Sequence, residues 1–277
     1  MPKDFRATAL ERAVGRKLAR WRDALGLSLT EAGGRVGFSS AKLSMMENAM
    51  QPSAPLDVMA LGYVYKVPTP EWQFVLSQSE RAAELRATIR PEQAIFDPAE
   101  DFPQLVADAT LLRTFTTDTV PSVFQLVGYT DAATYGDDPV KSSVTARVRE
   151  SWASRSEGND PLAVEAVLPE AVLRQVVGGP RLMKAQLLRL MEVSEQPNVS
   201  LRVVPGTCPA MGCPFTWLTF PHRQHDDVVY LETFLRCEYV EEPSKIEKVS
   251  QRFTALRELA LSDGESMKLI AEAASTL

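Results

Sequence analysis

Residues 28–47, SLTEAGGRVGFSSAKLSMME, predict two short helices joined by a tight turn. Ser28 can cap the first helix, and Glu31, three residues later, completes a capping box. Gly37 lies where this helix must end, in the left-handed conformation that glycine adopts without steric cost. We therefore expect a helix-turn-helix, a geometry that lays its second helix into the major groove of DNA.

The second helix of this pair is expected to begin at Ser39 or Ser40, either of which can serve as its N-cap. Its sequence turns Leu43 and Met46 toward the core and leaves a small, polar face outward. Such a face suits a helix that approaches DNA closely. Gene regulation is therefore the leading hypothesis for the function.

The flanking sequence predicts further helices around this pair. One helix precedes it and ends at Gly26, because apolar side chains recur there every three or four residues. These side chains are Leu10, Val14, Leu18, Trp21 and Leu25. Two more helices are expected at about 56–65 and 70–89, between proline breaks. Residues 1–90 are thus predicted to form an all-α domain of four to five helices.

Beyond a proline-containing joint at 91–103 the pattern changes, and residues 91–277 are predicted to form an α+β domain with a small sheet. Short β-rich runs are expected at 162–168, 199–204, 215–220 and 228–232. Helices are expected at 140–154, 180–193 and 245–261, and a last one after a capping box that begins at Ser262. Residues 105–115 are expected to form one helix or a strand–helix element.

The charge distribution supports this division into two domains. The net charge of the 277 residues is −6. Through Pro55, however, nine Lys and Arg residues stand against five Asp and Glu, which gives +4 and leaves −10 for the rest. A basic head on an acidic body fits a DNA-binding domain joined to one that does not touch DNA. In the alternative interpretation, Arg12, Arg16, Lys17 and Arg20 only form the solvated face of the first helix.

Composition limits the class and location of the protein. A hydrophobic content of 45% and a charged content of 24% are typical of a globular protein. No apolar run approaches the roughly 18–20 residues that span a bilayer. The N-terminal sequence lacks the apolar core of a secretory signal. We therefore expect a cytoplasmic protein without a membrane partner.

Two long parts of the sequence resemble known regulators. Residues 10–54, LERAVGRKLARWRDALGLSLTEAGGRVGFSSAKLSMMENAMQPSA, resemble the helix-turn-helix of the Xre/Cro-type repressor family. Residues 168–205, LPEAVLRQVVGGPRLMKAQLLRLMEVSEQPNVSLRVVP, are similar to the C-terminal domain of actinobacterial, Streptomyces-like regulators, and so is GCPFTWLTFP at 212–221. The resemblance implies a lambda-repressor-like fold and sequence-specific binding to double-stranded DNA. It also implies a homodimer and a small partner protein encoded nearby, as in antitoxin-like or developmental regulators.

By this resemblance, the start of the first motif helix and the outer face of the second contact DNA. The corresponding residues are Leu29, Thr30, Ser39, Ser40, Ala41, Lys42, Ser44, Met45 and Asn48. Lys42 and the serines at the helix N-terminus suit phosphate oxygens. Ala41 suits the methyl group of thymine.

The sequence departs from the family pattern on this face. The family usually has glutamine at the positions of Leu29 and Ser40, and arginine at that of Met45, and those side chains bond bases or phosphates best. Gly33 and Gly34 also weaken their helix by about 1 kcal/mol each relative to alanine. We therefore expect the affinity for DNA to be low, or to depend on dimerisation and on the arginines of the first helix. The alternative is an interaction (antitoxin-like) protein with weak or no DNA binding.

All three cysteines and both histidines fall in one segment, at Cys208, Cys213, His222, His225 and Cys237. Thiolate and imidazole at short spacing are ligands of zinc, so a metal- or thiol-responsive switch is a further alternative. The spacing matches no standard finger, and such cysteines are more often core or loop thiols. No metal site is favoured, and no cofactor is expected.

The sequence lacks the motifs of common catalytic sites. It contains no GxSxG, no phosphate-binding glycine loop and no HExxH. We therefore expect a protein that is not an enzyme, whose C-terminal domain serves dimerisation or binds a partner or a ligand.

Overall fold

The computed structural model describes most of the chain, in residues 7–88, 98–133, 139–156, 161–206, 212–220, 227–232 and 237–277. Two compact units divide these residues. The first unit contains the described residues up to 88, and the second contains those from 98 onward. The domain boundary predicted between residues 90 and 91 lies outside the described residues and stays a prediction.

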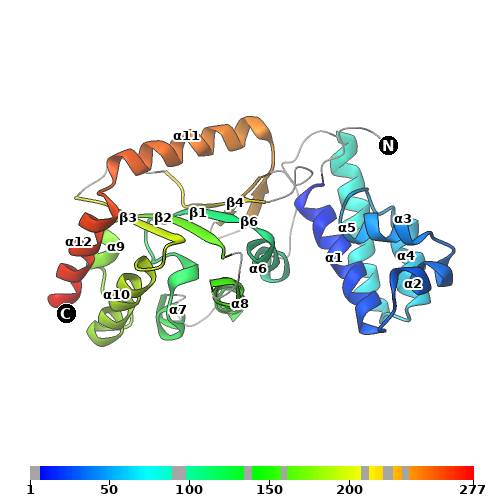
Figure 1. Ribbon diagram of the computed structural model, residues 1–277, viewed down its shortest axis with the longest axis horizontal. Helices are drawn as coiled ribbons and strands as arrows, with labels where there is room; N and C mark the ends of the chain where they lie inside the picture. Colours follow the sequence, from blue (N-terminus) through cyan, green and yellow to red (C-terminus); the bar gives the residue numbers. More distant parts are fainter. Residues whose placement is uncertain are drawn as a thin grey trace. The chain divides into compact units, whose positions relative to one another are not determined.

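The first unit is all-α, as predicted (Figure 1). Its helices are α1 (Ala9–Ala24), α2 (Leu29–Val36), α3 (Ser40–Glu47), α4 (Pro55–Val64) and α5 (Thr69–Thr88). Apolar side chains from these helices form one buried cluster, in which Leu18, Leu43, Met46 and Leu61 are fully buried. The cluster fixes α2 and α3 against α1 and α4.

The local signals that define the helix pair are confirmed. The Ser28 hydroxyl accepts a hydrogen bond from the backbone N–H of Glu31 at 3.2 Å, and the Glu31 carboxylate accepts one from the N–H of Ser28 at 2.9 Å. The Ser28 hydroxyl also donates to this carboxylate at 2.6 Å, and this bond, together with the one from the Ser28 N–H, lowers the pKa of Glu31. Gly37 ends α2 with a φ of 73°, in the left-handed region. Ser39 caps α3 by accepting from the N–H of Lys42 at 3.1 Å.

The second unit is an α+β domain built on one mixed sheet, as predicted. Its strands are β1 (Leu111–Phe115), β2 (Ala163–Pro169), β3 (Val199–Val204), β4 (Phe215–Thr219), β5 (Val228–Glu232) and β6 (Cys237–Val240). The strand order is β3-β2-β1-β4-β5-β6, with β1, β2 and β3 parallel and the other pairs antiparallel. The order places β1 and β4 at the centre of the sheet.

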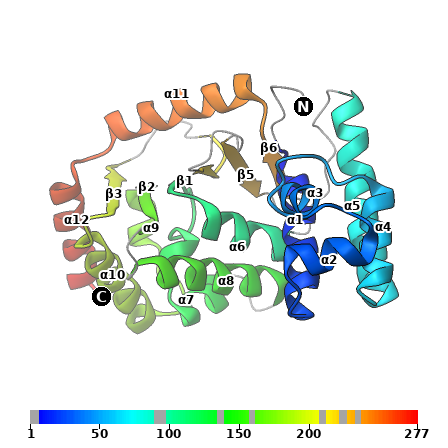
Figure 2. The same ribbon diagram turned by 45° about the vertical axis from the view of Figure 1, so that its right-hand side comes forward.

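Helices cover both faces of this sheet (Figures 1 and 2). They are α6 (Pro98–Asp108), α7 (Val127–Ala133), α8 (Pro139–Ser156), α9 (Glu170–Arg174), α10 (Pro180–Ser194), α11 (Pro243–Leu259) and α12 (Asp263–Ser275), with a 3₁₀ turn at Ser122–Phe124. α11 lies on one face, and α6, α7, α8 and α10 lie on the other. Phe253 of α11 packs against Phe215 of β4, with the ring centroids 6.2 Å apart.

Two expectations for this domain were inaccurate, and one strand was not predicted. The expected joint at 91–103 overlaps α6, which begins at Pro98 and contains Pro103. The segment 105–115 contains the end of α6 followed by β1, so the helix precedes the strand. β6 was not predicted, because a four-residue edge strand is too short to show an alternating pattern.

Candidate nucleic-acid interface

Close backbone contact with α1 positions the predicted recognition helix α3. A β-carbon added at Gly15 of α1 would lie only 2.7 Å from the carbonyl oxygens of Met46 and Glu47. Any side chain at Gly15 would therefore push the two helices apart. The glycine allows α1 to support the C-terminal end of α3 directly.

A largely buried ion pair joins the same two helices. Arg22 of α1 donates from Nε and Nη2 to the two carboxylate oxygens of Glu47, each at 2.8 Å. Its Nη1 donates to the carbonyl oxygen of Leu27 at 2.9 Å. The side chains are only 15% and 5% exposed, and the hydrogen bonds that Arg22 donates to Glu47 raise the pKa of Arg22. Arg22 therefore holds α1, the connecting turn and α3 together, and its charge is paired within the fold.

The turn between α2 and α3 explains one of the two glycines that weaken α2. A β-carbon at Gly33 would lie 2.5 Å from the carbonyl oxygen of Phe38, whereas one at Gly34 would meet nothing within 4 Å. The N–H of Phe38 also bonds to the carbonyl oxygen of Gly33 at 2.8 Å. The turn therefore requires glycine at Gly33. Gly34 has no such role and only lowers the stability of the helix relative to alanine.

The structure brings the nine predicted DNA-contacting residues onto α3 and the start of α2, with unequal exposure. The exposed ones are Thr30, Ser39, Ser40, Ala41 and Asn48. The half-buried ones are Leu29, Lys42, Ser44 and Met45. Leu29 packs against the core cluster, so its side chain stabilises the fold. The exposed outer surface of α3 is small and polar, with Ser40 and Ala41 at its N-terminal end.

Lys42 is the only cation in the sequence of α3, and it is held within the unit. Its Nζ lies 2.9 Å from a carboxylate oxygen of Asp57 in α4, and 3.7 Å from the centroid of the Phe38 ring. The side chain of Asn48 likewise donates to the carbonyl oxygen of Ser44 at 2.8 Å. Lys42 and Asn48, both predicted to contact DNA, therefore already have partners within the unit. This fits the low affinity for DNA that the sequence predicts.

The cations of α1 do not form one solvated face. Arg12 is buried, with 2% of its surface exposed, and its Nη1 donates to the carbonyl oxygen of Ala7 at 2.9 Å. Arg16 and Lys17 are half-buried and have partners, whereas Arg20 is exposed. Arg12 therefore stabilises the fold from a buried position, and the interpretation that placed it on a solvated face is wrong.

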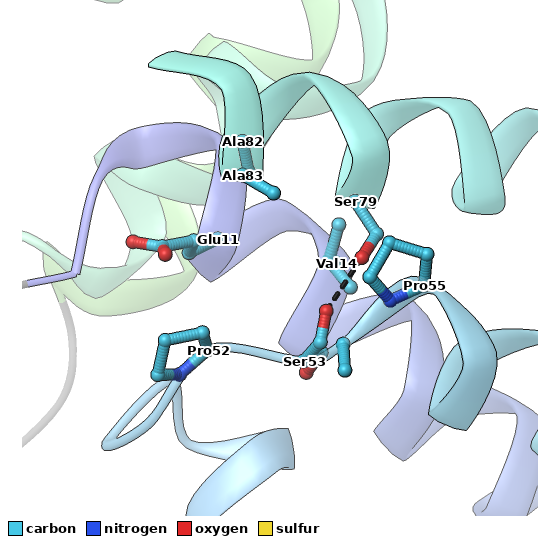
Figure 3. A pocket seen from close by; sticks show the side chains of 9 residues that line it. Glu11, Val14, Pro52, Ser53, Pro55, Ser79, Ala82 and Ala83 are labelled. Atoms are coloured by element: carbon cyan, nitrogen blue, oxygen red, sulfur yellow. Dashed lines mark hydrogen bonds between the residues drawn. The ribbon is translucent and has the colours of Figure 1, made fainter. Parts of the chain in front are cut away.

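A separate cavity of about 380 Å³ lies in the first unit between α1, α5 and the segment that precedes α4 (Figure 3). Figure 3 shows Ser79 donating a hydrogen bond to the carbonyl oxygen of Ser53 across it. The ionisable side chain in the lining, Glu11, accepts a hydrogen bond from the N–H of Thr8 at 2.9 Å. None of the described lining residues is basic, so this cavity adds nothing to a DNA-binding surface.

The proposed metal ligands lie largely outside the described residues, which omit Cys208, His222 and His225. Cys213 is exposed, and the sulfur of Cys237 accepts a hydrogen bond from the Tyr230 hydroxyl at 3.0 Å. The described part of the chain contains no group of three His, Cys, Asp or Glu side chains arranged for a metal ion. The metal hypothesis stays untested.

Each of the two units matches a known family model. Residues 13–72 match the family model described as a helix-turn-helix domain. Residues 99–272, well over half of the chain, match the model described as a domain of unknown function, DUF5753. The chain belongs to the DUF5753 family. No curated protein matches the sequence.

In this DUF5753 protein the helix-turn-helix match covers α2 and α3 completely, together with their supports in α1 and α4. Sequence reasoning missed two residues that govern the interface, Glu47 and Asp57. Asp57 carries a local signal, because it lies in the first turn of α4, where acidic residues interact with the helix dipole. Its pairing with Lys42 depends on the packing of α4 beside the motif.

Among the residues that the structure describes in this DUF5753 protein, no helix has the length and apolar character that a bilayer crossing requires.

Proposed function

We propose that this protein is a sequence-specific, DNA-binding transcriptional regulator of the Xre type. The observation that carries the proposal is the exposed, small, polar face of α3, which follows the Gly37 turn and is anchored to α1. This is the arrangement in which a recognition helix enters the major groove. The match to a helix-turn-helix family supports the same conclusion.

In this proposal the exposed residues divide into two roles. Ser40 and Ala41 lie at the N-terminal end of α3, where they face base edges. Thr30 and the N-terminal amides of α3 hold phosphates, together with Arg35, which is exposed at the end of α2. The regulator acts as a homodimer, with two recognition helices about 34 Å apart on successive major grooves. It acts by binding and catalyses no reaction.

Replacement of Asp57 by asparagine is expected to tighten DNA binding by about three- to tenfold, because it frees Lys42 for a phosphate. The slope of log K against log salt should become more negative by about 0.9, which is the value for one added phosphate contact. Lys42→Gln should weaken binding and leave this slope no steeper than in the wild type. Fluorescence anisotropy on DNA from upstream of the gene, across a salt series, measures both.

The control for this prediction is Glu192→Gln, which removes one negative charge from an exposed residue in the second unit. It changes the net charge equally but should leave DNA affinity unchanged. If Asp57→Asn and Glu192→Gln have the same effect, net charge rather than Lys42 governs binding. If no fragment binds the wild type even at low salt, the regulator proposal itself is wrong.

The second candidate function is an interaction, antitoxin-like protein whose helix-turn-helix serves as a scaffold. The internal pairing of Lys42 with Asp57 and of Asn48 with Ser44 favours it, because both pairs withdraw polar groups from a DNA contact. Its second unit would then bind a small partner protein. Absence of DNA binding at low salt, together with a stable complex with the product of a neighbouring gene, would support this function.

A further inference from the structure

A groove of about 410 Å³ lies in the second unit between α11 and the sheet. The central strands line it with Arg113, Glu165 and Trp217, and α11 lines it with Thr254 and Arg257. The apolar side of α11 covers the neighbouring part of this sheet face through Phe253 and Leu256. The groove is therefore a polar opening beside a well-packed core.

Strand register brings the polar side chains together. Arg113 on β1 is aligned with Glu165 on β2 and with Trp217 on β4, so the three side chains leave the same face of the sheet. The Nε of Arg113 lies 3.1 Å from Glu165 Oε2, and its guanidinium carbon lies 4.2 Å from the centroid of the Trp217 ring. This stacking fixes the plane of the Arg113 guanidinium.

Glu165 is shared between two arginines. Its second oxygen, Oε1, accepts a hydrogen bond from Nη1 of Arg257 at 3.0 Å. One carboxylate thus serves two guanidinium groups, and these three side chains carry a net charge of about +1 at neutral pH. They are only 22–32% exposed, so solvent screens the excess charge incompletely.

Both guanidinium groups keep unused donors. Arg113 donates from Nε to Glu165 and from Nη1 to the hydroxyl of Thr219 at 3.3 Å, and Arg257 donates from Nη1. An arginine has five N–H groups. Among the described residues, the others have no protein partner. Thr254, exposed on α11, also lines the groove, but its hydroxyl already donates to the carbonyl oxygen of Ser250 at 3.0 Å.

Three further kinds of charged side chain lie near the groove: a paired arginine, a half-buried aspartate and an exposed glutamate. Arg202 lines one side and is paired with Asp263 at 3.1 Å. Asp227 accepts hydrogen bonds from the indole N–H of Trp217 at 2.7 Å and from the hydroxyl of Thr219 at 3.0 Å. Glu258 also lines the groove, at an exposed position of α11 where water and salt screen its charge. Thr219 links Asp227 to Arg113, so this carboxylate offsets part of the positive charge, and the case for an anion rests on the unused guanidinium donors of Arg113 and Arg257.

We propose that this groove, formed by Arg113, Glu165, Trp217, Thr254 and Arg257, binds a small anionic molecule through phosphate or carboxylate oxygens. We name it the anion groove. The planar fork of a guanidinium matches both groups by two parallel hydrogen bonds. A purely structural role explains the residues less well, because apolar packing stabilises a sheet face at least as well as a partly buried ion network. The proposal goes beyond the regulator function and does not depend on DNA binding.

Isothermal titration of the full chain at low salt, with pyrophosphate in one arm and citrate in the other, tests this proposal. We expect saturable binding of at least one anion, beyond the effect of sodium chloride at equal ionic strength. Arg257→Gln should weaken it at least tenfold. Arg174→Gln, at an exposed ion pair on α9, is the matched control and should bind as the wild type does. Tighter binding of pyrophosphate identifies a phosphate ligand, and tighter binding of citrate a carboxylate ligand.

Three results would overturn the proposal. They are the absence of binding of both anions by the wild type, equal binding by Arg257→Gln, and an equal loss in Arg174→Gln. If circular dichroism shows that Arg257→Gln does not fold, Arg257→Lys takes its place, because it keeps the charge but loses the planar fork. A loss of affinity with Arg257→Lys then supports the anion groove, and unchanged affinity contradicts it.

Discussion

Replacement of Glu47 by alanine is expected to lower the free energy of unfolding of the first unit by about 3 kcal/mol. The substitution removes the carboxylate to which Nε and Nη2 of Arg22 donate, in a site where only 15% of the Arg22 side chain is exposed. Asp23 and the carbonyl oxygen of Leu27 still accept from Nη1 of Arg22, but the other two nitrogens lose their partners in a site with little water, which is costly. Urea denaturation followed by circular dichroism measures the loss.

Asp23→Ala provides a matched control for the Glu47 substitution. Asp23 pairs with the same arginine at 2.7 Å, but its side chain is 65% exposed. Its removal should cost less than about 1 kcal/mol, because water replaces an exposed partner well. Equal losses in the two variants would show that burial of the pair does not determine its contribution.

Replacement of Gly33 by alanine is expected to destabilise the first unit by about 2–3 kcal/mol, the cost of overpacking a close contact. The added β-carbon would lie 2.5 Å from the carbonyl oxygen of Phe38, a backbone atom that can move away only if the turn opens. Because the turn sets the angle between α2 and α3, DNA binding should fall as well. Thermal or urea unfolding and the anisotropy titration measure the two effects.

The neighbouring glycine is the control for this prediction. Gly34→Ala adds the same methyl group to the same helix, but nothing lies within 4 Å of it. It should stabilise the unit by about 0.5–1 kcal/mol, because alanine favours the helix over glycine. Stabilisation by both substitutions would show that the Gly33 contact relaxes without cost.

The sequence was most informative where the determining signals are local. Ser28 and Gly37 define the limits of α2 through contacts within a few residues, so the helix-turn-helix could be predicted from composition and spacing alone. The same holds for the capping box at Ser262, which opens α12. A proline suggested a joint at Pro103, but tertiary packing of α6 on α8 overrode it, and Ser151 donates a hydrogen bond to the Pro103 carbonyl there.

The properties of the candidate sites depend on contacts between distant residues. Arg22 and Glu47 are 25 positions apart, and nothing in their spacing predicts that they meet. Glu165 is 52 positions from Arg113 and 92 from Arg257, so the anion groove exists only once the strand order and the position of α11 are known. The sequence predicted which residues lie on α3, but not which of them are already engaged.

The pairing of Lys42 with Asp57 has an evolutionary consequence. Aspartate and asparagine codons differ by one base, so a single point mutation at this position would release the cation of the recognition helix. Under the proposed regulator function, selection could then change the strength of DNA attachment without altering any residue proposed to read the bases. Specificity and strength of binding would be separately adjustable within one helix-turn-helix.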